Sequence, residues 1–260
     1  MTEKRLRPAK TISTEVLDSL SMKVCSKIEN AASESMACAA KIDSGAAERI
    51  SECSYYILHI QQEFRDYCRI ISGNYSVEKE LCDICEGVKF FSDAARPILN
   101  NKGIMLVSEA PQNPMYAFIN RKAIRQALSA IVLNSAEHSK PGGKIEIKLE
   151  ETARTIKISV HDNGSGMDEE TLAHCMEPLF SGKMASGNRQ PLGLGLTLAR
   201  YYVQDCGGRI KIKSFEKKAT RVEIILPKPK ELPTGEVHSA PRPLAGYDDT
   251  EMRIAFAPIL

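Results

Sequence analysis

A β-strand that runs into a glycine-rich turn is encoded by Ile156-Lys-Ile-Ser-Val-His-Asp162-Asn-Gly164-Ser-Gly166. Its isoleucines and Val160 alternate with polar residues, which is the pattern of a strand with one buried face. The acid that follows can accept a hydrogen bond from an exocyclic amine, and two close glycines allow backbone to approach a flat ring. Because Asp-Asn-Gly is also a common turn sequence, these residues alone indicate either a ligand contact or an ordinary turn.

The same alternation between apolar and polar residues recurs nearby. It is found at Ile145, Ile147 and Leu149, at Ile210 and Ile212, and at Val222, Ile224 and Leu226. Segments with helical periodicity fit between these strands, at about residues 121–138, 168–175 and 194–206. Since the strands are few and apolar on one side, we expect one sheet covered by helices on a single face.

A second glycine-rich segment, Pro191-Leu-Gly193-Leu-Gly195-Leu196, opens the last of these helices. Glycines at a helix start expose free N–H groups, and the helix dipole favours an anion there. The segment lacks the Gly-Lys-Ser/Thr of a Walker A loop, and no strand leads directly into it as in a dinucleotide fingerprint. It therefore indicates an anion contact of another kind.

Asn134 lies on the helix predicted at about residues 121–138. Its side-chain oxygen could ligate Mg²⁺, which takes oxygen ligands and keeps several waters. An isolated asparagine on a helix is more often simply solvated, so this residue alone leaves both interpretations open.

The order of these features carries a family resemblance. Four segments of the chain resemble, in order, the N, G1, F and G2 boxes of the GHKL ATPase superfamily. They are Asn134, the DxGxG turn, Glu177-Pro-Leu-Phe-Ser-Gly-Lys183 and Gly-Leu-Gly-Leu. That superfamily includes histidine kinases, DNA gyrase, heat-shock chaperones and mismatch-repair ATPases. The Glu-Pro-Leu-Phe-Ser-x-Lys run resembles histidine kinases of the nitrogen-regulation type. The resemblance covers about residues 76–227 and implies a GHKL (Bergerat) α/β sandwich with a mixed sheet.

The resemblance also implies a nucleotide site whose cofactors are ATP and Mg²⁺. Asp162 would hold the adenine amine, Gly164 and Gly166 would line the base, and Asn134 would ligate Mg²⁺. The remaining implied contacts are Phe180 and Lys183, which would flank an ATP lid at Met184 to Leu192, and Gly193, Leu194 and Gly195, which would contact phosphates.

Three positions depart from the boxes of that superfamily. Ala130 stands where a second asparagine is common, Glu137 stands where a basic residue is common, and Pro191 replaces the first glycine of the G2 box. Each change could weaken a metal or phosphate contact, but none removes Asp162 or Asn134. We therefore expect ATP binding to be retained and weakened.

Upstream, residues 13–72 have the pattern of two long helices. In the first, apolar and small residues recur at steps of three and four, at Leu17, Leu20, Val24, Ile28, Ala32, Ser35, Ala39 and Ile42. Asp43-Ser-Gly45 would join the helices, and Ile50, Ile57, Phe64 and Ile71 form a heptad seam on the second. Two helices cannot enclose a core, so we expect a homodimer with a four-helix bundle. The alternative is that both helices pack on their own chain.

This hairpin resembles the dimerisation and phosphoacceptor domain of histidine kinases, but it lacks the acceptor. In the best register with a box such as His-Glu-Ile-Lys-Asn-Pro, Ser26 takes the place of the histidine and Lys27 that of the acid. A serine without a base is a poor nucleophile, and an ammonium group cannot serve as that base. His59, on the second helix, is either a structural or solvated histidine or a relocated acceptor.

Three functions are compatible with this pattern. The first is a dimeric ATP-binding regulator or pseudokinase of a two-component pathway, unable to autophosphorylate in the usual way, which could contact a response-regulator receiver domain. The second is an active protein kinase, a phosphotransferase that acts on histidine or serine of a partner. The third is an interaction module with a vestigial pocket.

Composition excludes several other classes. The formal net charge of +2 gives no case for a nucleic-acid partner. No apolar stretch approaches the ~20 residues that span a bilayer, and the charged residues 1–10 are unlike a signal peptide, so we expect a cytoplasmic protein with no membrane contact. Eight cysteines in a chain of this length are expected to be free thiols, including the Cys82-x-x-Cys85 pair, which falls in a helical pattern.

The chain is therefore expected to be an α+β protein in four parts. These are an N-terminal tail at 1–12, the helical hairpin at 13–75, the ATP-binding domain at 76–227 and a Pro-rich tail at 228–260. The domain is expected to start with a helix at about residues 77–99 that stops at Asn100-Asn-Lys-Gly103. The end of the tail, Met252 to Leu260, is apolar enough to dock somewhere.

Overall fold

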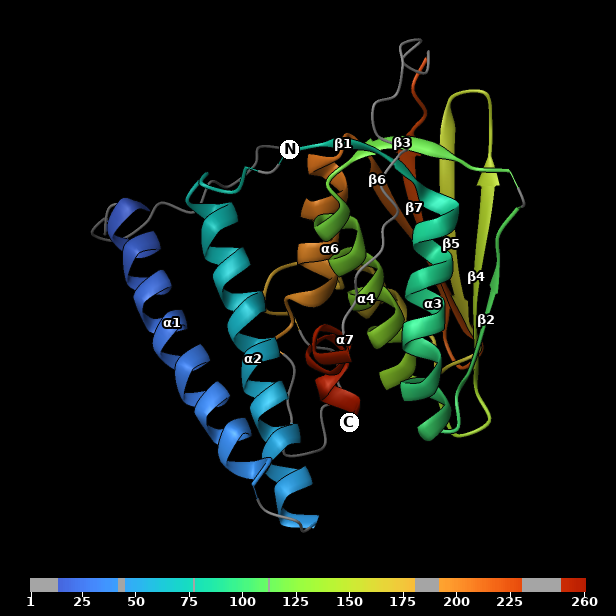
Figure 1. Cartoon of the computed structure of the whole chain (residues 1–260). Coiled ribbons are helices and arrows are strands. Elements are labelled where there is room, and N and C mark those ends of the chain that lie inside the picture. The colour runs from blue at the N-terminus through green and yellow to red at the C-terminus, as the bar shows by residue number, and fades with distance from the viewer. Residues whose placement is uncertain (1–13, 42–44, 77, 112, 181–191, 231–248) are drawn as a thin grey trace.

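The computed structural model describes residues 14–41, 45–76, 78–111, 113–180, 192–230 and 249–260. Its N-terminal part is the expected helical hairpin, formed by α1 (Thr14–Ala39) and α2 (Gly45–Ile71). α1 packs on α2 (Figure 1) through small residues at heptad spacing, Ser21, Cys25, Ala32 and Ala39, all of which are buried. Val24, which the sequence pattern grouped with the packing residues, is instead exposed.

The second part of the chain is built on a mixed five-stranded sheet with the order β2-β4-β5-β7-β6. Its strands are β2 (Met105–Glu109), β4 (Lys144–Glu151), β5 (Thr155–Asp162), β6 (Arg209–Phe215) and β7 (Ala219–Pro227). β2 runs parallel to β4, and the other neighbours are antiparallel. A separate antiparallel pair is formed by β1 (Glu80–Asp83) and β3 (Tyr116–Ile119).

Three helices cover one face of the five-stranded sheet: α3 (Ile84–Asn101), α4 (Arg121–Glu137) and α6 (Gly195–Asp205) (Figure 1). The short α5 (Glu169–His174) follows the end of β5. The buried core lies between this helical layer and the sheet, where apolar residues of β4, β5 and β7 face apolar residues of α3, α4 and α6. The expected α+β architecture with helices on one side of a mixed sheet is therefore confirmed.

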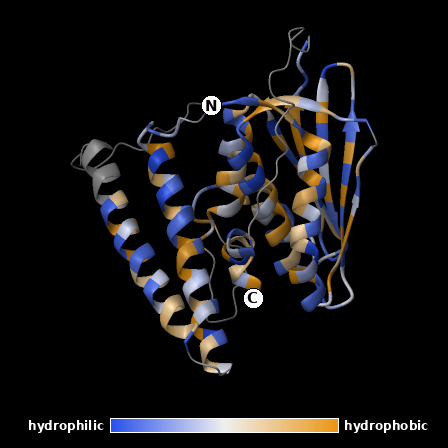
Figure 2. Cartoon of the chain, in the orientation of Figure 1, coloured by the Kyte–Doolittle hydropathy of each residue, from blue (hydrophilic) through white to orange (hydrophobic). Residues whose placement is uncertain are grey.

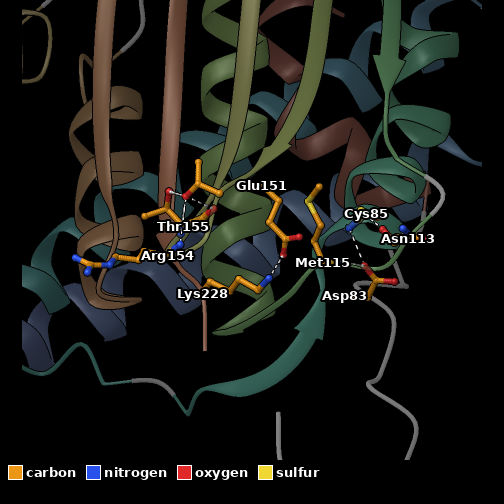
Figure 3. A network of polar contacts seen from close by, with 9 residues as sticks. Asp83, Cys85, Asn113, Met115, Glu151, Arg154, Thr155 and Lys228 are labelled. Atoms are coloured by element: carbon orange, nitrogen blue, oxygen red, sulfur yellow. Dashed lines mark hydrogen bonds and ion pairs between the residues drawn. The ribbon is translucent and has the colours of Figure 1, made fainter. Parts of the chain in front are cut away.

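The predicted helix at residues 77–99 is wrong in its first part, which forms strand β1. Cys82 pairs with Ala117 of β3, and the Asp83 side chain ends the strand by accepting the backbone N–H of Cys85 at 2.9 Å (Figure 3). The same carboxylate accepts the N–H of Met115 at 3.3 Å, and the Cys85 thiol donates to the Asn113 carbonyl at 3.4 Å. Cys82 and Cys85 are free, buried thiols, but only Cys85 lies on a helix.

The end of the chain folds back onto the rest of the molecule. α7 (Asp249–Ala255) and the 3₁₀-helix η1 (Ala257–Ile259) lie between the hairpin and the helical layer (Figure 1). Phe256 is fully buried, with its ring 6.3 Å from that of Phe91 on α3, and Ile254 packs with Leu58 of α2. The apolar stretch that ends the predicted tail therefore joins the hairpin to the helical layer.

None of the described helices combines the length and the apolarity that crossing a bilayer would require. Along α2, hydrophilic and hydrophobic residues are interspersed (Figure 2), so the helix has no continuous apolar stretch.

Candidate functional site

Asp162 is the last residue of β5 and is only 2% exposed. Side chains alternate along a strand, so Asp162 faces the same helix-covered side as Val160 and Ile158, which are buried in the core. One of its oxygens, Oδ1, accepts the backbone N–H of Gly164 at 3.0 Å. A carboxylate therefore stands at the edge of the core beneath the helical layer, where a ligand amine could reach it.

The glycine-rich loop after Asp162 is clamped from two sides. A Cβ on Gly164 would lie 2.6 Å from the His138 carbonyl oxygen, and one on Gly166, whose φ is +66°, would lie 2.0 Å from the Phe215 carbonyl oxygen. Ser165 donates its N–H to the His138 carbonyl at 3.0 Å. Both glycines are thus required by close backbone packing within the chain, which fixes the loop between the end of α4 and the turn after β6.

α4 and the residue that caps it contact two of the predicted nucleotide segments, the loop at Gly164 and the start of α6 at Gly195. His138 follows its last turn and contacts the loop at Gly164, while Ala130 contacts the start of α6, since a Cβ on Gly195 would lie 3.8 Å from the Ala130 Cβ. Asn134 lies four residues from each. Positions four apart share one helix face, so Asn134 lies between the Asp162 loop and Gly195 on the side of α4 that they line.

The start of α6 is arranged to leave backbone donors available. Gly193 has φ of +67°, and a Cβ there would lie 2.5 Å from the Phe180 carbonyl oxygen. Leu179 donates its N–H to the Gly193 carbonyl at 3.0 Å, which joins the F and G2 segments. Leu194 is buried, and its side chain provides no cap for the first turn of α6. The first N–H groups of that helix are therefore suited to an anion.

Part of the predicted site lies outside the described residues, namely Lys183 and the lid from Met184 to Pro191. Phe180 is described and is half-buried, with its ring 5.8 Å from that of His174. Within the described chain, no group of three or more His, Cys, Asp or Glu side chains could hold a metal ion. A metal at Asn134 would therefore need oxygen ligands from the nucleotide phosphates and from water, which is how Mg²⁺ is usually bound with nucleotides.

A cavity of about 110 Å³ extends from Ala130 and Gly195 toward the hairpin. It lies between α2, α4, α6 and α7, and its lining includes His59 and Glu63 of α2, Lys122 of α4 and Glu251 of α7. Lys122 and Gln126 continue the four-residue steps that pass through Ala130 and Asn134. The cavity is thus a continuation of the side of α4 that carries the predicted contacts.

Burial keeps the two titratable groups of α2 in this cavity uncharged near neutral pH. It lowers the pKa of His59 to about 4, against a raising effect of a hydrogen bond with the Ile254 backbone. It raises the pKa of Glu63 to about 8, with a further contribution from the nearby Glu137 carboxylate. His59 Nε2 and Glu63 Oε1 are 3.7 Å apart. Since both groups are neutral, the pair is a packing contact and not an ion pair.

A buried aspartate on α2 holds the hairpin against the helical layer. Asp66 is 5% exposed, and its Oδ2 accepts the Tyr202 hydroxyl at 2.7 Å and the Gln126 amide at 3.2 Å. Sequence reasoning missed Glu63, Asp66 and Tyr202. For Glu63 and Asp66 the available signal was their position on the side of α2 away from the heptad seam, which by itself also fits solvated residues.

Ser26 and Lys27 are both exposed on α1. α2 lies between α1 and the helical layer (Figure 1), so within one chain the structure does not bring these two residues to Asn134 or Gly195. His59, in contrast, lines the cavity beside Gly195 and packs against α7. The described hairpin therefore presents a histidine of α2, and not Ser26, to the rest of its own chain.

Comparisons with known proteins agree with this geometry. A family model described as "Histidine kinase-, DNA gyrase B-, and HSP90-like ATPase" matches residues 119–230. The sensor histidine kinase YvrG of Bacillus subtilis (strain 168) is 24% identical over 182 residues, which cover 69% of this chain and 31% of that protein. The chain spans about a third of the length of such curated relatives.

Solved structures share the fold across both parts of the chain. Acinetobacter baumannii histidine kinase AdeS is similar with a TM-score of 0.55 and 17% identity, over 80% of this chain and 96% of that chain. Full-length ShkA, solved in complex with AMPPNP, is similar with a TM-score of 0.67 and 16% identity, over 84% of this chain and 46% of that chain.

Proposed function

We propose that this chain binds Mg-ATP as a histidine-kinase-like protein of a two-component signalling pathway, because residues 119–230 match the family model of histidine-kinase-like ATPases and the chain is similar to sensor histidine kinases. The observation that carries the proposal is the alignment along α4. The loop after the buried Asp162, the amide of Asn134 and the open first turn of α6 follow one another at single-turn steps on one side of this helix.

Each of these groups has a distinct part in holding the nucleotide. The Asp162 carboxylate accepts the adenine amine, and the clamped Gly164–Gly166 loop fixes that acceptor in place. The Asn134 amide supplies an oxygen ligand for Mg²⁺. The N–H groups at Gly195 donate to phosphate oxygens. When bound, Mg-ATP supplies a transferable γ-phosphoryl group.

The hairpin lacks the residues that would receive this group in the usual way. Ser26 occupies the acceptor position with Lys27 beside it, and neither residue can act as a base for the other. Both lie on α1, on the far side of α2 from α4 and α6 (Figure 1). We therefore propose a protein that binds ATP without autophosphorylating in the usual way, and so acts as a regulator.

An exposed apolar seam on α2 supports a homodimer. Ile50, Ile57, Phe64 and Ile71 lie seven residues apart and are 40–47% exposed, while the opposite side of α2 is used within the chain. A seam with this period is suited to a helical partner. A second copy of the hairpin would cover it in a four-helix bundle, and that bundle would be the surface for a receiver domain of a response regulator.

Calorimetric titration of the purified chain with AMPPNP, with and without Mg²⁺, tests nucleotide binding. We expect a magnesium-dependent Kd below about 1 mM, equivalent to ~4 kcal/mol of binding free energy. Asp162→Asn should abolish this binding. The remaining side-chain oxygen would still accept the Gly164 N–H, so the new NH2 group would face the adenine amine, and two donors cannot form a hydrogen bond. Absence of magnesium-dependent binding in the wild type would overturn the proposal.

Incubation with γ-labelled ATP tests the second half of the proposal. The chain alone should acquire no acid-labile phosphate. Label that appears on the chain and is lost in His59→Ala would show an active kinase with a relocated acceptor. Label transferred to an added receiver or other protein, and lost in Asp162→Asn, would show an active kinase that acts on a partner.

A further inference from the structure

The proposed nucleotide site runs beside α4 from the Asp162 loop to Gly195, and we call it the groove along α4. The hairpin meets this site at its Gly195 end. On one side of the meeting point are Ala130 and Gly195, where the phosphate end of the nucleotide is proposed to lie. On the other side are His59 and Glu63 of α2, which line the same cavity. Any ligand group that extends past Gly195 along α4 would therefore meet the side chains of α2.

Glu63 is the residue of α2 that comes closest to this point. Its Oε1 lies 3.4 Å from the position that a Cβ on Gly195 would occupy, at the first turn of α6. The first turn of a helix attracts oxygen atoms of acidic groups through its free N–H groups and its dipole. A carboxyl group of the protein thus lies next to the donors that would otherwise face a phosphate.

Two sets of contacts keep Glu63 in this place. Asp66, less than one turn further along α2, is bonded to Tyr202 of α6 and Gln126 of α4. On the other side, α7 connects both parts: Ile254 packs with Leu58 of α2, while Glu251 lies 3.3 Å from Arg125 of α4. The hairpin is therefore held against the groove by polar contacts on one side and by the end of the chain on the other.

We infer that the docked hairpin is an autoinhibited arrangement, in which Glu63 occupies the phosphate end of the nucleotide groove and must leave before a triphosphate can bind fully. This inference rests on the proposed Mg-ATP binding and concerns its regulation. Adenine binding at Asp162 is unaffected by the hairpin, because its clamp is made by His138 and Phe215. Triphosphate binding and hairpin docking are mutually exclusive, and α7, through its contacts with both parts, biases the balance toward docking.

The electrostatics of the cavity support this competition. Burial raises the pKa of Glu63, so the carboxyl group sits there mostly protonated, next to the neutral His59. A phosphate brought beside it would add negative charge near a buried carboxyl group whose pKa the Glu137 carboxylate already helps to raise, and like charges repel more strongly where the dielectric is low. Undocking removes Glu63 and also exposes Arg125, which lines the cavity with a side chain that is 15% exposed and can attract phosphate together with the already exposed Lys122.

The test compares two probes that differ only at the phosphate end, AMP and Mg-AMPPNP, in calorimetric titrations of the full chain. For Glu63→Ala we expect Mg-AMPPNP to bind at least about tenfold more tightly than to the wild type, a ratio equivalent to ~1.4 kcal/mol. AMP should bind both proteins with the same affinity. Gln62→Ala, a change at the neighbouring residue of the same cavity, is the matched control and should alter neither affinity.

Hydrogen exchange gives a readout that does not depend on a variant. Saturating Mg-AMPPNP should increase amide exchange in α2 around Glu63 and in α7 of the wild type, whereas saturating AMP should not. Unchanged or increased protection of α2 with bound Mg-AMPPNP would overturn the inference, as would equal tightening of AMP and Mg-AMPPNP in Glu63→Ala. Failure of both probes to bind any of these proteins would instead overturn the proposed function together with this inference.

Discussion

The two ends of the groove along α4 are built in different ways. At the Asp162 end, the contacts are backbone to backbone, and Gly164 and Gly166 leave no room for even a methyl group. At the Gly195 end, side chains of α2, α4 and α7 line a cavity. The hydrogen bonds of Asp66 hold α2 in place beside it. A groove with one rigid end and one that depends on a docked element can separate recognition of the base from admission of the phosphates.

The largest effect is expected at the rigid end, from Gly166→Ala. The new Cβ would lie 2.0 Å from a backbone oxygen at a φ of +66°, so the loop must shift, and the free energy of unfolding should fall by about 3 kcal/mol. Urea unfolding of the wild type and the variant measures this difference in the free energy of unfolding. Gly45→Ala, which has nothing within 4 Å of the new Cβ, should change stability by less than about 0.5 kcal/mol. Equal effects of the two changes would contradict the clamp.

The next effect concerns the contact that docks the hairpin. Asp66→Ala leaves the buried Tyr202 hydroxyl without its acceptor, which should cost about 2 kcal/mol. Hydrogen exchange should then rise across α2 while the β5–α5 region keeps its protection. Adding Tyr202→Phe to Asp66→Ala removes the unpaired donor as well, so this second change should cost little further stability. A uniform loss of protection in both parts of the chain would show that they do not separate as the comparison requires.

The outer side of the hairpin should respond in its oligomeric state. Phe64→Asp places a charge in the middle of the exposed heptad seam, so the proposed dimer should dissociate at micromolar concentration in sedimentation equilibrium. Phe215→Asp changes an equally apolar residue that is exposed on β6, away from the hairpin, and should leave the dimer intact. A wild-type chain that sediments as a monomer at high concentration would refute the assignment of the seam.

The smallest effect is a pH dependence of the docked end. The pKa of Glu63 is raised from 4.5 to about 8 by burial, so its contribution to stability is fully present below pH 4.5 and is lost as the pH rises to about 8. His59, with a pKa lowered from 6.5 to about 4, contributes fully above pH 6.5 and loses its contribution below that.

Between pH 6.5 and 8 the two residues therefore differ in behaviour, and only Glu63 changes its contribution. The wild type is therefore compared with Glu63→Gln, which cannot titrate at this position. Both proteins share the other groups that face Glu63, which are Glu137, Glu251, Lys122, Arg125 and Tyr202. The stability advantage of the wild type over this non-titrating variant should shrink as the pH rises through this range. An advantage that stays constant or grows would contradict a buried, protonated carboxyl group.

Much of the fold could be predicted from the sequence, because long segments carry clear periodicity. The two hairpin helices, strands β4 to β7 and helices α4 to α6 lie close to their predicted positions. β1, β2 and β3 were missed because four or five residues are too few to show alternation. α7 was missed because its helix depends on tertiary packing of Met252 and Phe256, next to a Pro-rich segment that suggests a tail.

The candidate site divides in the same way. Asp162, Asn134 and Gly195 could be singled out because their order along the chain matches known boxes, and their nucleotide roles stay predictions. Glu63 and Asp66 could not be found, because the heptad pattern identifies only the apolar side of α2. The partners of Asp66 are 60 and 136 residues away in sequence, so only the folded chain shows that this polar side faces α4 and α6.

The most direct test of the account is a crystal structure of the chain with Mg-AMPPNP. The adenine amine should donate to Asp162, and the metal should be bound to the Asn134 amide oxygen and to phosphate oxygens. A nucleotide bound at any other place, or a chain that stays empty at millimolar Mg-AMPPNP, would contradict the assignment of the groove along α4.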